Sequence, residues 1–229
     1  MPRWLPVDAS SYAGDIDGLM MLITVIVGVW LIVAEVVLLF FIVRFRRRAG
    51  QRAAYLPGNT KKAMAWVLVP VALVLICDFA IEAASAPVWE KIKIERPKPD
   101  SVVRIVGRQW SWEFDYPGSD GVLGTADDVV AVNDLHVPLG ATVEFELRST
   151  DTLHSFWVPA LRLKQDAVPG RNIRGWFKAT RPGAYEIYCA QLCGVAHMAM
   201  KGTLYVDTPE DFHRWRIATK QGSGEEAGE

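Results

Sequence analysis

The chain has 229 residues, a length that allows one or two compact units. Its 25 Lys and Arg residues against 26 Asp and Glu residues leave a formal net charge of −1, and we expect no nucleic-acid partner. Hydrophobic residues make up 51% of the chain. They are unevenly distributed, which excludes a uniform soluble domain.

The first predicted element is a transmembrane helix over about residues 17–44, after a short polar lead at 1–16. Its centre, Leu19–Val43, is 25 residues long and contains one charge, Glu35. At about 1.5 Å per residue it reaches roughly 37 Å, enough to cross a hydrocarbon core of about 30 Å. The basic flank follows the apolar run, so we expect no cleavable signal peptide.

A second helix is expected over about residues 61–86, with a kink at Pro70. Its charge-free part, Ala63–Cys77, spans only about 22 Å, which is too short to cross a membrane. The span must therefore be extended, and the extension places Asp78 and Glu82 at membrane depth.

The loop between the two helices carries basic residues and no acid: Arg44, Arg46, Arg47, Arg48, Arg52, Lys61 and Lys62. Short basic loops stay on the cytoplasmic side of a membrane. The sequence therefore predicts a transmembrane hairpin at 17–88 with a cytoplasmic loop. Both termini and the rest of the chain are then extracytoplasmic.

Residues 89–100, with Pro97 and Pro99, are expected to be a linker to a β-domain at 101–208. Short β-rich runs between Pro-Gly turns predict a Greek-key sandwich or small barrel. The expected strands are Val102–Gly107, Val129–Val132, Thr142–Leu147, Ile173–Ala179, Ala184–Tyr188 and Thr203–Val206. Residues 209–229 are expected to form a short helix and, from Gly222, a disordered tail.

One loop between two predicted strands carries a set of metal ligands in the sequence C-A-Q-L-C-G-V-A-H-M-A-M. Two thiolates, an imidazole and a thioether come from Cys189, Cys193, His197 and Met200. His154, expected in a distant loop, adds a second imidazole. Soft sulfur ligands together with imidazoles are typical of copper sites.

The second cysteine of this loop bears on the kind of site. A single blue-copper centre uses two His, one Cys and a weak axial Met. Two thiolates can instead bridge two metal ions, with one terminal His on each ion and Met200 and a backbone carbonyl in the axial positions. Structural zinc and a Cys189–Cys193 disulfide are the alternatives. Cys77 is expected to be an inert apolar side chain of the second helix.

With these residues, the chain resembles subunit II of heme–copper terminal oxidases, the copper-A subunit of cytochrome c oxidase. The motifs that carry the resemblance follow the hairpin in the family's order: G-R-Q-W-S-W-E-F, N-D-L-H-V-P-L-G, L-H-S-F-W-V-P, L-K-Q-D-A-V-P-G-R and the loop above. The resemblance implies an all-β cupredoxin-like domain with a dinuclear copper centre. It implies as ligands His154, Cys189, the backbone carbonyl of Gln191, Cys193, His197 and Met200.

The chain departs from the family pattern at two positions. Gln191 stands where most members carry a Glu, whose carboxylate also binds magnesium at the interface with subunit I. A neutral amide is a poorer Mg²⁺ ligand, so we expect copper to be kept and the magnesium site to be weakened or altered. Ala63 stands where many members carry a Glu near the mouth of a proton path. Protons then enter elsewhere, or this path is missing.

The resemblance also assigns roles to two tryptophans. In the family, the first Trp of the G-R-Q-W-S-W-E-F motif is exposed above the copper site and passes the incoming electron. We carry this role to Trp110, whereas Trp112 is expected to pack in the core.

Between Gln109 and Leu147 the chain has no Lys or Arg. The acids of this span are Glu113, Asp115, Asp120, Asp127, Asp128, Asp134, Glu144 and Glu146. They predict a docking face for a cationic donor such as cytochrome c or a cytochrome c domain. A merely solvated acidic loop is the alternative, and a Ca²⁺ site at 120–128 is another.

Other polar residues receive expectations of their own. Asp78 and Glu82 share one helix face and are expected to face subunit I or the outer interface. Glu35 has either a structural or a proton-related role. Near the surface of subunit I we expect Asp166 and Arg171. His136 is expected in a turn, structural or exposed, and His213 is expected to be solvated.

The resemblance implies an electron-accepting subunit of a membrane heme–copper oxidase. Cytochrome c would dock on its outer face, and electrons would pass to heme in subunit I, where oxygen is reduced to water. The implied partners are subunits I and III and the lipid bilayer of the inner cell membrane. The alternatives are a copper-A subunit of a nitric-oxide reductase and a membrane-anchored copper-delivery protein.

Overall fold

The computed structural model describes residues 5–53, 55 and 57–226, which divide into two units. One unit is Asp15–Lys91. The other combines the described part of the first 14 residues with the chain from Ile92 onward.

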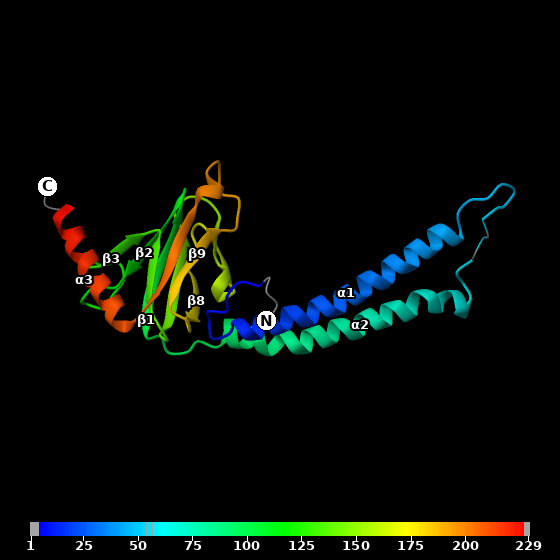
Figure 1. Ribbon diagram of the computed structural model, residues 1–229, viewed down its shortest axis with the longest axis horizontal. Coiled ribbons are helices and arrows are strands. Elements are labelled where there is room, and N and C mark those ends of the chain that lie inside the picture. The colour runs from blue at the N-terminus through cyan, green and yellow to red at the C-terminus, as the bar shows by residue number, and fades with distance from the viewer. Residues whose placement is uncertain (1–4, 54, 56, 227–229) are drawn as a thin grey trace. The chain divides into compact units, whose positions relative to one another are not determined.

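The first unit is a hairpin of two long apolar helices, as predicted. They are α1 (Ala13–Arg44) and α2 (Lys61–Trp89), joined by the basic loop. Figure 1 shows them antiparallel. Both are long and apolar enough to cross a membrane, and their apolar side chains are exposed along the spans. The indole N–H of Trp30 donates to Cys77 Sγ at 3.3 Å, so Cys77 lies in a contact between the helices.

The second helix extends beyond its predicted end at residue 86. It continues through Pro87 to Trp89, and a π-helical turn, Glu90–Ile94, follows. The backbone N–H of Glu90 donates to the carbonyls of Ala86 and Pro87, which keeps the chain helical. The predicted linker at 89–100 is therefore helical in its first half.

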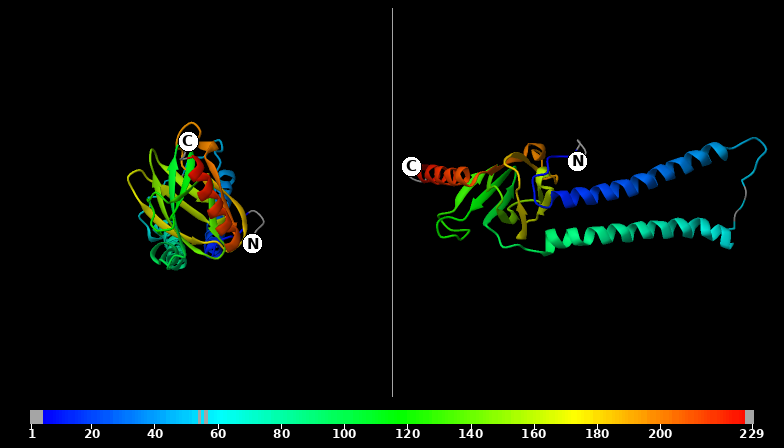
Figure 2. Two further views of the ribbon diagram at one scale, coloured as in Figure 1. Left: turned by 90° about the vertical axis from the view of Figure 1, so that its left-hand side faces the viewer. Right: turned by 60° about the horizontal axis from the view of Figure 1, so that its bottom comes forward.

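The second unit is a sandwich of two five-stranded sheets (Figures 1 and 2). The first sheet has the order β3-β2-β1-β5-β8 and the second has the order β4-β10-β9-β6-β7. The first five strands are β1 (Ser101–Arg108), β2 (Ser111–Tyr116), β3 (Val129–Val132), β4 (Asp134–Pro138) and β5 (Thr142–Ser149). The others are β6 (His154–Val158), β7 (Leu163–Ala167), β8 (Ile173–Lys178), β9 (Gly183–Cys189) and β10 (Lys201–Asp207).

Strand alternation builds the core of the sandwich. In β5, for example, Val143, Phe145 and Leu147 point inward and are buried, while the residues between them are partly accessible. Between the sheets, aromatic rings contact edge to face, including Trp112 with Phe156 at 5.2 Å between centroids. Such aromatic pairs add stability beyond their buried area.

Four of the strands were not predicted: β2, β4, β6 and β7. Strands β4 and β7 lie at the edges of the second sheet, where polar residues and Pro138 are tolerated. Strands β2 and β6 contain polar residues next to aromatic ones, which hides the apolar alternation. His154 consequently begins a strand, and His136 lies within β4, where a loop and a turn were expected.

The N-terminal lead packs against the sandwich. Ser10 forms an isolated bridge with Ala179, and the Ser10 hydroxyl donates to the Leu161 carbonyl at 2.8 Å. Tyr12 is buried with its ring against Trp176 at 5.5 Å. The described part of the predicted polar lead at 1–16 is thus part of the β-domain up to the start of α1.

A third helix, α3 (Pro209–Glu226), follows the last strand as predicted. It runs through 222–226, where a disordered tail was expected, because a helix already formed extends more readily than it nucleates. Residues 227–229 of that predicted tail lie outside the described residues. Trp215 of α3 stacks on His136 at 4.2 Å between ring centroids, and Tyr205 stacks on the same ring at 4.4 Å.

Candidate metal centre

The candidate metal ligands meet at one end of the sandwich, in the loop that joins the antiparallel strands β9 and β10. Cys189 is the last residue of β9, and Met200 directly precedes β10. Between them, a short 3₁₀ turn, His197–Ala199, follows Cys193. His154 comes from β6, whose Phe156 pairs with Cys189 in the sheet. Sheet pairing therefore fixes the imidazole against the loop.

The sulfur and nitrogen atoms of the cluster lie close together. The two thiol sulfurs are 3.7 Å apart. Cys189 Sγ lies 4.0 Å from His154 Nδ1, and Cys193 Sγ lies 3.6 Å from His197 Nδ1 and 3.8 Å from Met200 Sδ. Each thiol thus lies beside a different imidazole.

One backbone oxygen joins the cluster. Cys189 Sγ lies 3.2 Å from the Gln191 carbonyl oxygen, so this carbonyl points toward the sulfurs while the Gln191 side chain is exposed. The structure brings together all six predicted ligands. Both cysteines are free thiols, and no disulfide joins them.

The chemistry of this donor set fits a soft metal ion. His154, Cys189, Cys193 and Met200 are all buried, and His154, Cys189 and Cys193 offer donor atoms within 4.8 Å of one another. Burial raises the pKa of the Cys193 thiol to about 11, and the neighbouring Cys189 adds to the rise. Without metal, this thiol therefore stays protonated at neutral pH. A bound metal cation would displace the proton and stabilise the thiolate.

Asp151 is a site residue that the sequence reasoning missed. Its Oδ1 lies 2.7 Å from His154 Nε2, and its Oδ2 accepts from the backbone N–H of Gln109 at 2.6 Å. Burial opposes ionisation of this carboxyl, but the hydrogen bonds from His154, Gln109 and Thr152 hold its pKa below the ordinary value. Its position three residues before a candidate ligand was the signal available in the sequence.

The β1–β2 turn lies directly against the metal loop. Gln109 Nε2 donates to the Cys193 carbonyl at 2.7 Å. A Cβ added to Gly194, whose φ is +130°, would lie 3.2 Å from two atoms of the Trp110 indole. Trp110 therefore rests on the residue after Cys193, and it is 36% exposed. The contact needs a glycine both for its φ and for the space.

Trp112 is in the core, as predicted. It is fully buried, and its ring meets that of His154 edge to face at 6.0 Å between centroids. A Cβ on Gly107 of β1 would lie 3.1 Å from both His154 Cδ2 and Trp112 Cζ3. A glycine at this position therefore leaves room for the imidazole and the indole beside the strand.

The acidic span does not form one continuous exposed face, which corrects part of the prediction. Asp115 is buried beside Arg104, at 3.6 Å, and Glu146 is paired with arginines. Asp127 accepts hydrogen bonds from the Ser119 and Thr125 hydroxyls. Both oxygens of this carboxylate, a candidate Ca²⁺ ligand, are therefore already hydrogen-bonded within the loop. These hydrogen bonds hold the pKa of Asp127 well below its ordinary value.

The remaining predicted residues lie apart from the cluster. Asp78 and Glu82 on α2 and Glu35 on α1 are exposed on the isolated chain, as are Asp166 and Arg171, and their predicted roles stay predictions. His136 is structural, with Nδ1 2.7 Å from Asp207 Oδ2, and His213 is exposed.

Two membrane helices, a two-sheet β-domain and a buried cluster of thiols, imidazoles and a thioether define a class of protein. They are the features of a membrane-anchored subunit with a cupredoxin-like metal domain. The family model for the periplasmic domain of cytochrome c oxidase subunit II matches residues 101–205.

Relatives match along nearly the whole chain. An alternative cytochrome c oxidase subunit 2 of Bradyrhizobium diazoefficiens is 34% identical over 96% of this chain and 85% of its own. The cytochrome c oxidase subunit 2 of Thermostichus vulcanus is 31% identical over 93% of this chain and 77% of its own. The chain belongs to the cytochrome c oxidase subunit II family.

The periplasmic domain of subunit II (CoxB) of Bradyrhizobium japonicum is 30% identical, with a TM-score of 0.48, and the match covers 55% of this chain and 97% of that one.

Family membership confirms the predicted cupredoxin-like fold and the predicted function over its alternatives. The chain is the electron-transfer subunit of an oxidoreductase complex, cytochrome c oxidase, and is anchored in a membrane. The family binds copper, and the His154, Cys189 and Cys193 cluster fits a copper site.

Proposed function

We propose that this chain holds two copper ions in a dinuclear copper-A centre. Cys189 and Cys193 would bridge the ions, with His154 and His197 as terminal ligands and Met200 and the Gln191 carbonyl in the axial positions. The pairing of each thiol with its own imidazole supports this arrangement more than any other observation. A single ion would need only one of the two thiolates.

When bound, the copper pair would supply one-electron redox chemistry. Three contacts fix the position of His154. Strand pairing places it beside the metal loop, Asp151 orients its ring, and Trp112 packs against the ring. The side chains of four proposed ligands are buried and that of His197 is half-buried. A set of buried ligands held by outer partners disfavours exchange of the metal, which supports electron transfer over copper delivery. The set leaves no position open for a substrate.

Trp110 would be the surface at which the donor, cytochrome c or a cytochrome c domain, delivers its electron. Its indole is exposed on one side and lies against Gly194 of the metal loop on the other. Around it the loop exposes apolar side chains, among them Leu192, Val195 and Met198. Only the Trp110 side chain and the metal loop would then lie between a docked donor and the metal ligands. The electron would continue to heme in subunit I, for reduction of oxygen to water.

The exposed Gln191 side chain is a neutral amide where most family members have a carboxylate. Copper would be unaffected, because the ligand is the backbone carbonyl. A magnesium ion at the interface with subunit I would be held more weakly or not at all.

The membrane topology would place both termini and the metal domain outside the cytoplasm of the inner membrane. The basic loop at 44–62 supports this orientation. Partners in the membrane would be subunit I, with its heme and copper, and subunit III.

Copper counting on the full chain tests the proposal. We expect two copper ions per chain, a purple colour and an electron paramagnetic resonance signal shared equally by two copper nuclei. The Cys193→Ser variant should lose the shared signal, because one bridge is gone. The variant Cys77→Ser, a matched thiol change in the membrane hairpin, should keep it. One copper per native chain would contradict the dinuclear centre.

A further inference from the structure

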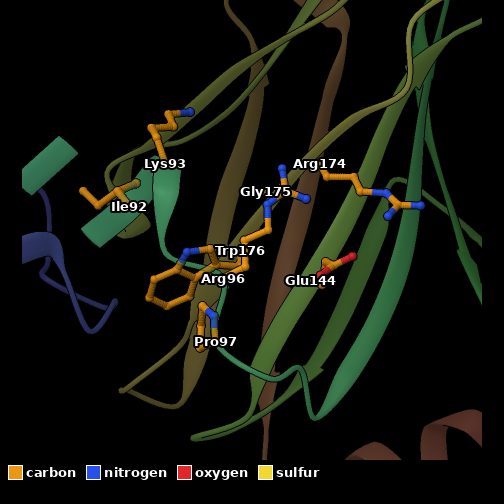
Figure 3. Close-up of a pocket in the computed structure, with 8 residues that line it drawn as sticks. All are labelled: Ile92, Lys93, Arg96, Pro97, Glu144, Arg174, Gly175 and Trp176. Atoms are coloured by element: carbon orange, nitrogen blue, oxygen red, sulfur yellow. The ribbon is translucent and has the colours of Figure 1, made fainter. Parts of the chain in front are cut away.

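A small pocket opens on the β-domain beside the chain segment that follows α2 (Figure 3). Its lining comes from that segment and from strands β5 and β8. The lining residues are Ile92, Lys93, Arg96, Pro97, Glu144, Arg174, Gly175 and Trp176. The enclosed volume is about 20 Å³. A space of this size admits a single oxygen-sized group and excludes a whole organic ligand.

The lining carries more positive than negative charge. Lys93, Arg96 and Arg174 face one acid, Glu144. Arg174 lies 2.8 Å from Glu146, but this carboxylate is shared with Arg148 at 3.3 Å and Arg104 at 3.9 Å. Asp115 also pairs with Arg104, at 3.6 Å, and Glu144 lines the same pocket, so acids balance these arginines. The surplus of positive charge that favours an anion comes from Lys93 and Arg96.

Two of the cations, Lys93 and Arg96, form no ion pair with any residue that the structure describes. Lys93 Nζ donates to the neutral amide oxygen of Gln165 at 2.9 Å. Among the described residues, no carboxylate lies within ion-pair distance of Lys93 or Arg96. The Lys93 side chain is exposed, and partial desolvation by the surrounding chain lowers its pKa.

The chain connection places these cations near lipid headgroups. From Ala63 to Trp89, α2 rises about 39 Å, against a bilayer of about 40–45 Å including its headgroups. Trp89, 61% exposed, therefore lies at the headgroup level opposite the basic loop, where Trp residues are enriched. Lys93 follows four residues later, within about 14 Å of chain.

We propose that this pocket binds the phosphate group of an anionic phospholipid. A phosphate oxygen would enter the cavity between Lys93 and Arg96, and the rest of the headgroup would stay outside beside Trp176. The membrane supplies this phosphate at the level where the cations lie, whereas free phosphate has no such local enrichment. The proposal rests on the proposed topology in one respect only, the choice of leaflet. Because that topology puts the β-domain outside the cytoplasm, the lipid belongs to the outer leaflet.

Lipid binding by the full chain in detergent tests the proposal. Native mass spectrometry would count bound phosphatidylglycerol and phosphatidylcholine at equal concentrations. We expect phosphatidylglycerol to bind the native chain more tightly. Each charge-assisted hydrogen bond to the phosphate contributes at least about fivefold, so the double variant Lys93→Gln with Arg96→Gln should bind it at least about 25-fold more weakly. Lys98→Gln, an exposed charge change in the same segment outside the pocket, should bind it like the native chain.

Several outcomes would overturn the proposal. Equal binding of the two lipids would show that charge does not select the ligand. An equal loss in Lys98→Gln would show a diffuse surface effect. Displacement by inorganic phosphate at the lipid's own concentration would identify a free anion as the ligand. In the assembled oxidase, carbodiimide cross-linking of Lys93 to an acid of another subunit, with no lipid retained, would identify a protein contact.

The copper absorbance of the same samples reports on the metal centre independently. A chain that binds two copper ions without selecting phosphatidylglycerol would contradict the lipid site alone. A chain that selects the lipid but binds one copper would contradict the proposed function alone.

Discussion

Asp151 connects the two functional parts of the candidate site. One of its carboxylate oxygens holds His154 Nε2 and the other holds the backbone of Gln109, next to Trp110. Because the carboxylate accepts a hydrogen bond, the proton of the imidazole belongs on Nε2. Nδ1, which faces Cys189, is then free to bind metal.

Replacing Asp151 by Asn should therefore weaken copper binding. Loss of the charged acceptor removes the preference for the correct tautomer, and loss of such outer partners typically costs about 10–100-fold in metal affinity. Competition of the full chain with a copper chelator would measure the change. The control is Asp134→Asn, the same substitution at an exposed acid without a hydrogen bond to a candidate ligand. Equal affinities for Asp151→Asn and the native chain would show that Asp151 does not orient the ligand.

Trp110 is the second residue whose role its position predicts. The variant Trp110→Ala should slow electron acceptance from cytochrome c by at least about tenfold, because exposed Trp residues at interface centres commonly contribute this much. The copper spectrum should stay unchanged, since Trp110 lies against Gly194, which is not a proposed ligand. Stopped-flow reduction of the copper centre would measure the rate.

The matched control for that experiment is Trp157→Ala. Trp157 is 38% exposed, close to the exposure of Trp110, but it lies beside Tyr188 on the second sheet. It should leave the rate unchanged. If both variants slow the reaction equally, the effect does not come from a path through Trp110.

At this scale, ligand types and their spacing could be predicted from the sequence, because five of the six lie in one loop. Asp151 could not be predicted in the same way. Its partner His154 was expected in a loop, and only the start of β6 and the curl of residues 149–152 bring the carboxylate to the imidazole. A hydrogen bond to a ligand depends on such local geometry rather than on residue type.

Among the elements, α3 is attached to the sandwich through an aromatic stack. The His136 ring lies between Tyr205 of β10 and Trp215 of α3, nearly parallel to both. Tyr116 adds an edge-to-face contact with Trp215 at 5.0 Å, and its hydroxyl donates to the His136 carbonyl at 3.0 Å. Burial raises the pKa of Tyr116 well above its ordinary value, so its hydroxyl stays protonated and able to donate.

The variant Trp215→Ala should therefore destabilise the β-domain by about 2–4 kcal/mol, from lost apolar burial and lost ring contacts. Thermal unfolding of the full chain in detergent, followed by near-ultraviolet circular dichroism, would measure it. Ile217→Ala on the same helix, where the side chain is 47% exposed, should change stability by less than about 0.5 kcal/mol. An unchanged melting temperature for Trp215→Ala would mean that α3 does not stabilise the sandwich.

The predicted elements were most accurate where one physical signal dominates. Long apolar runs fixed the two membrane helices to within a few residues. Strands with clear apolar alternation, such as β3 and β5, were also found. The missed strands are edge strands or mix polar and aromatic residues, and their assignment depends on which neighbour supplies the hydrogen bonds. The packing of Ser10 and Tyr12 on the sandwich likewise depends on contacts with residues more than 150 positions away.

For the whole molecule, the distribution of acids decides how a cationic donor is attracted. The acids of the predicted docking face are split along β2. Glu113 lies near Trp110 and pairs with Arg108, whereas Asp120 and its neighbours lie in the loop beyond the other end of the strand. At about 3.4 Å per residue, that loop begins roughly 20 Å from Trp110. This separation exceeds the screening length of about 8–10 Å at physiological salt.

Charge attraction and apolar contact should therefore both contribute to docking. With a basic cytochrome c, KM should rise several-fold as ionic strength increases from about 0.02 M to about 0.2 M, because screening weakens attraction to Glu113 and, at low salt, to the more distant acids. The value of kcat should change little, since salt does not reach the buried ligands. Steady-state oxygen consumption by the assembled oxidase would measure both constants.

Two variants separate the acids that attract the donor from those that do not. Glu113→Gln should reduce the slope of KM against ionic strength, because it removes a negative charge beside Trp110. Asp120→Asn makes the same charge change beyond the screening length and should keep the native slope at physiological salt. A native KM independent of salt would leave only the apolar side chains of the metal loop to hold the donor. A slope reduced equally by both variants would instead mean that the donor covers the far loop as well.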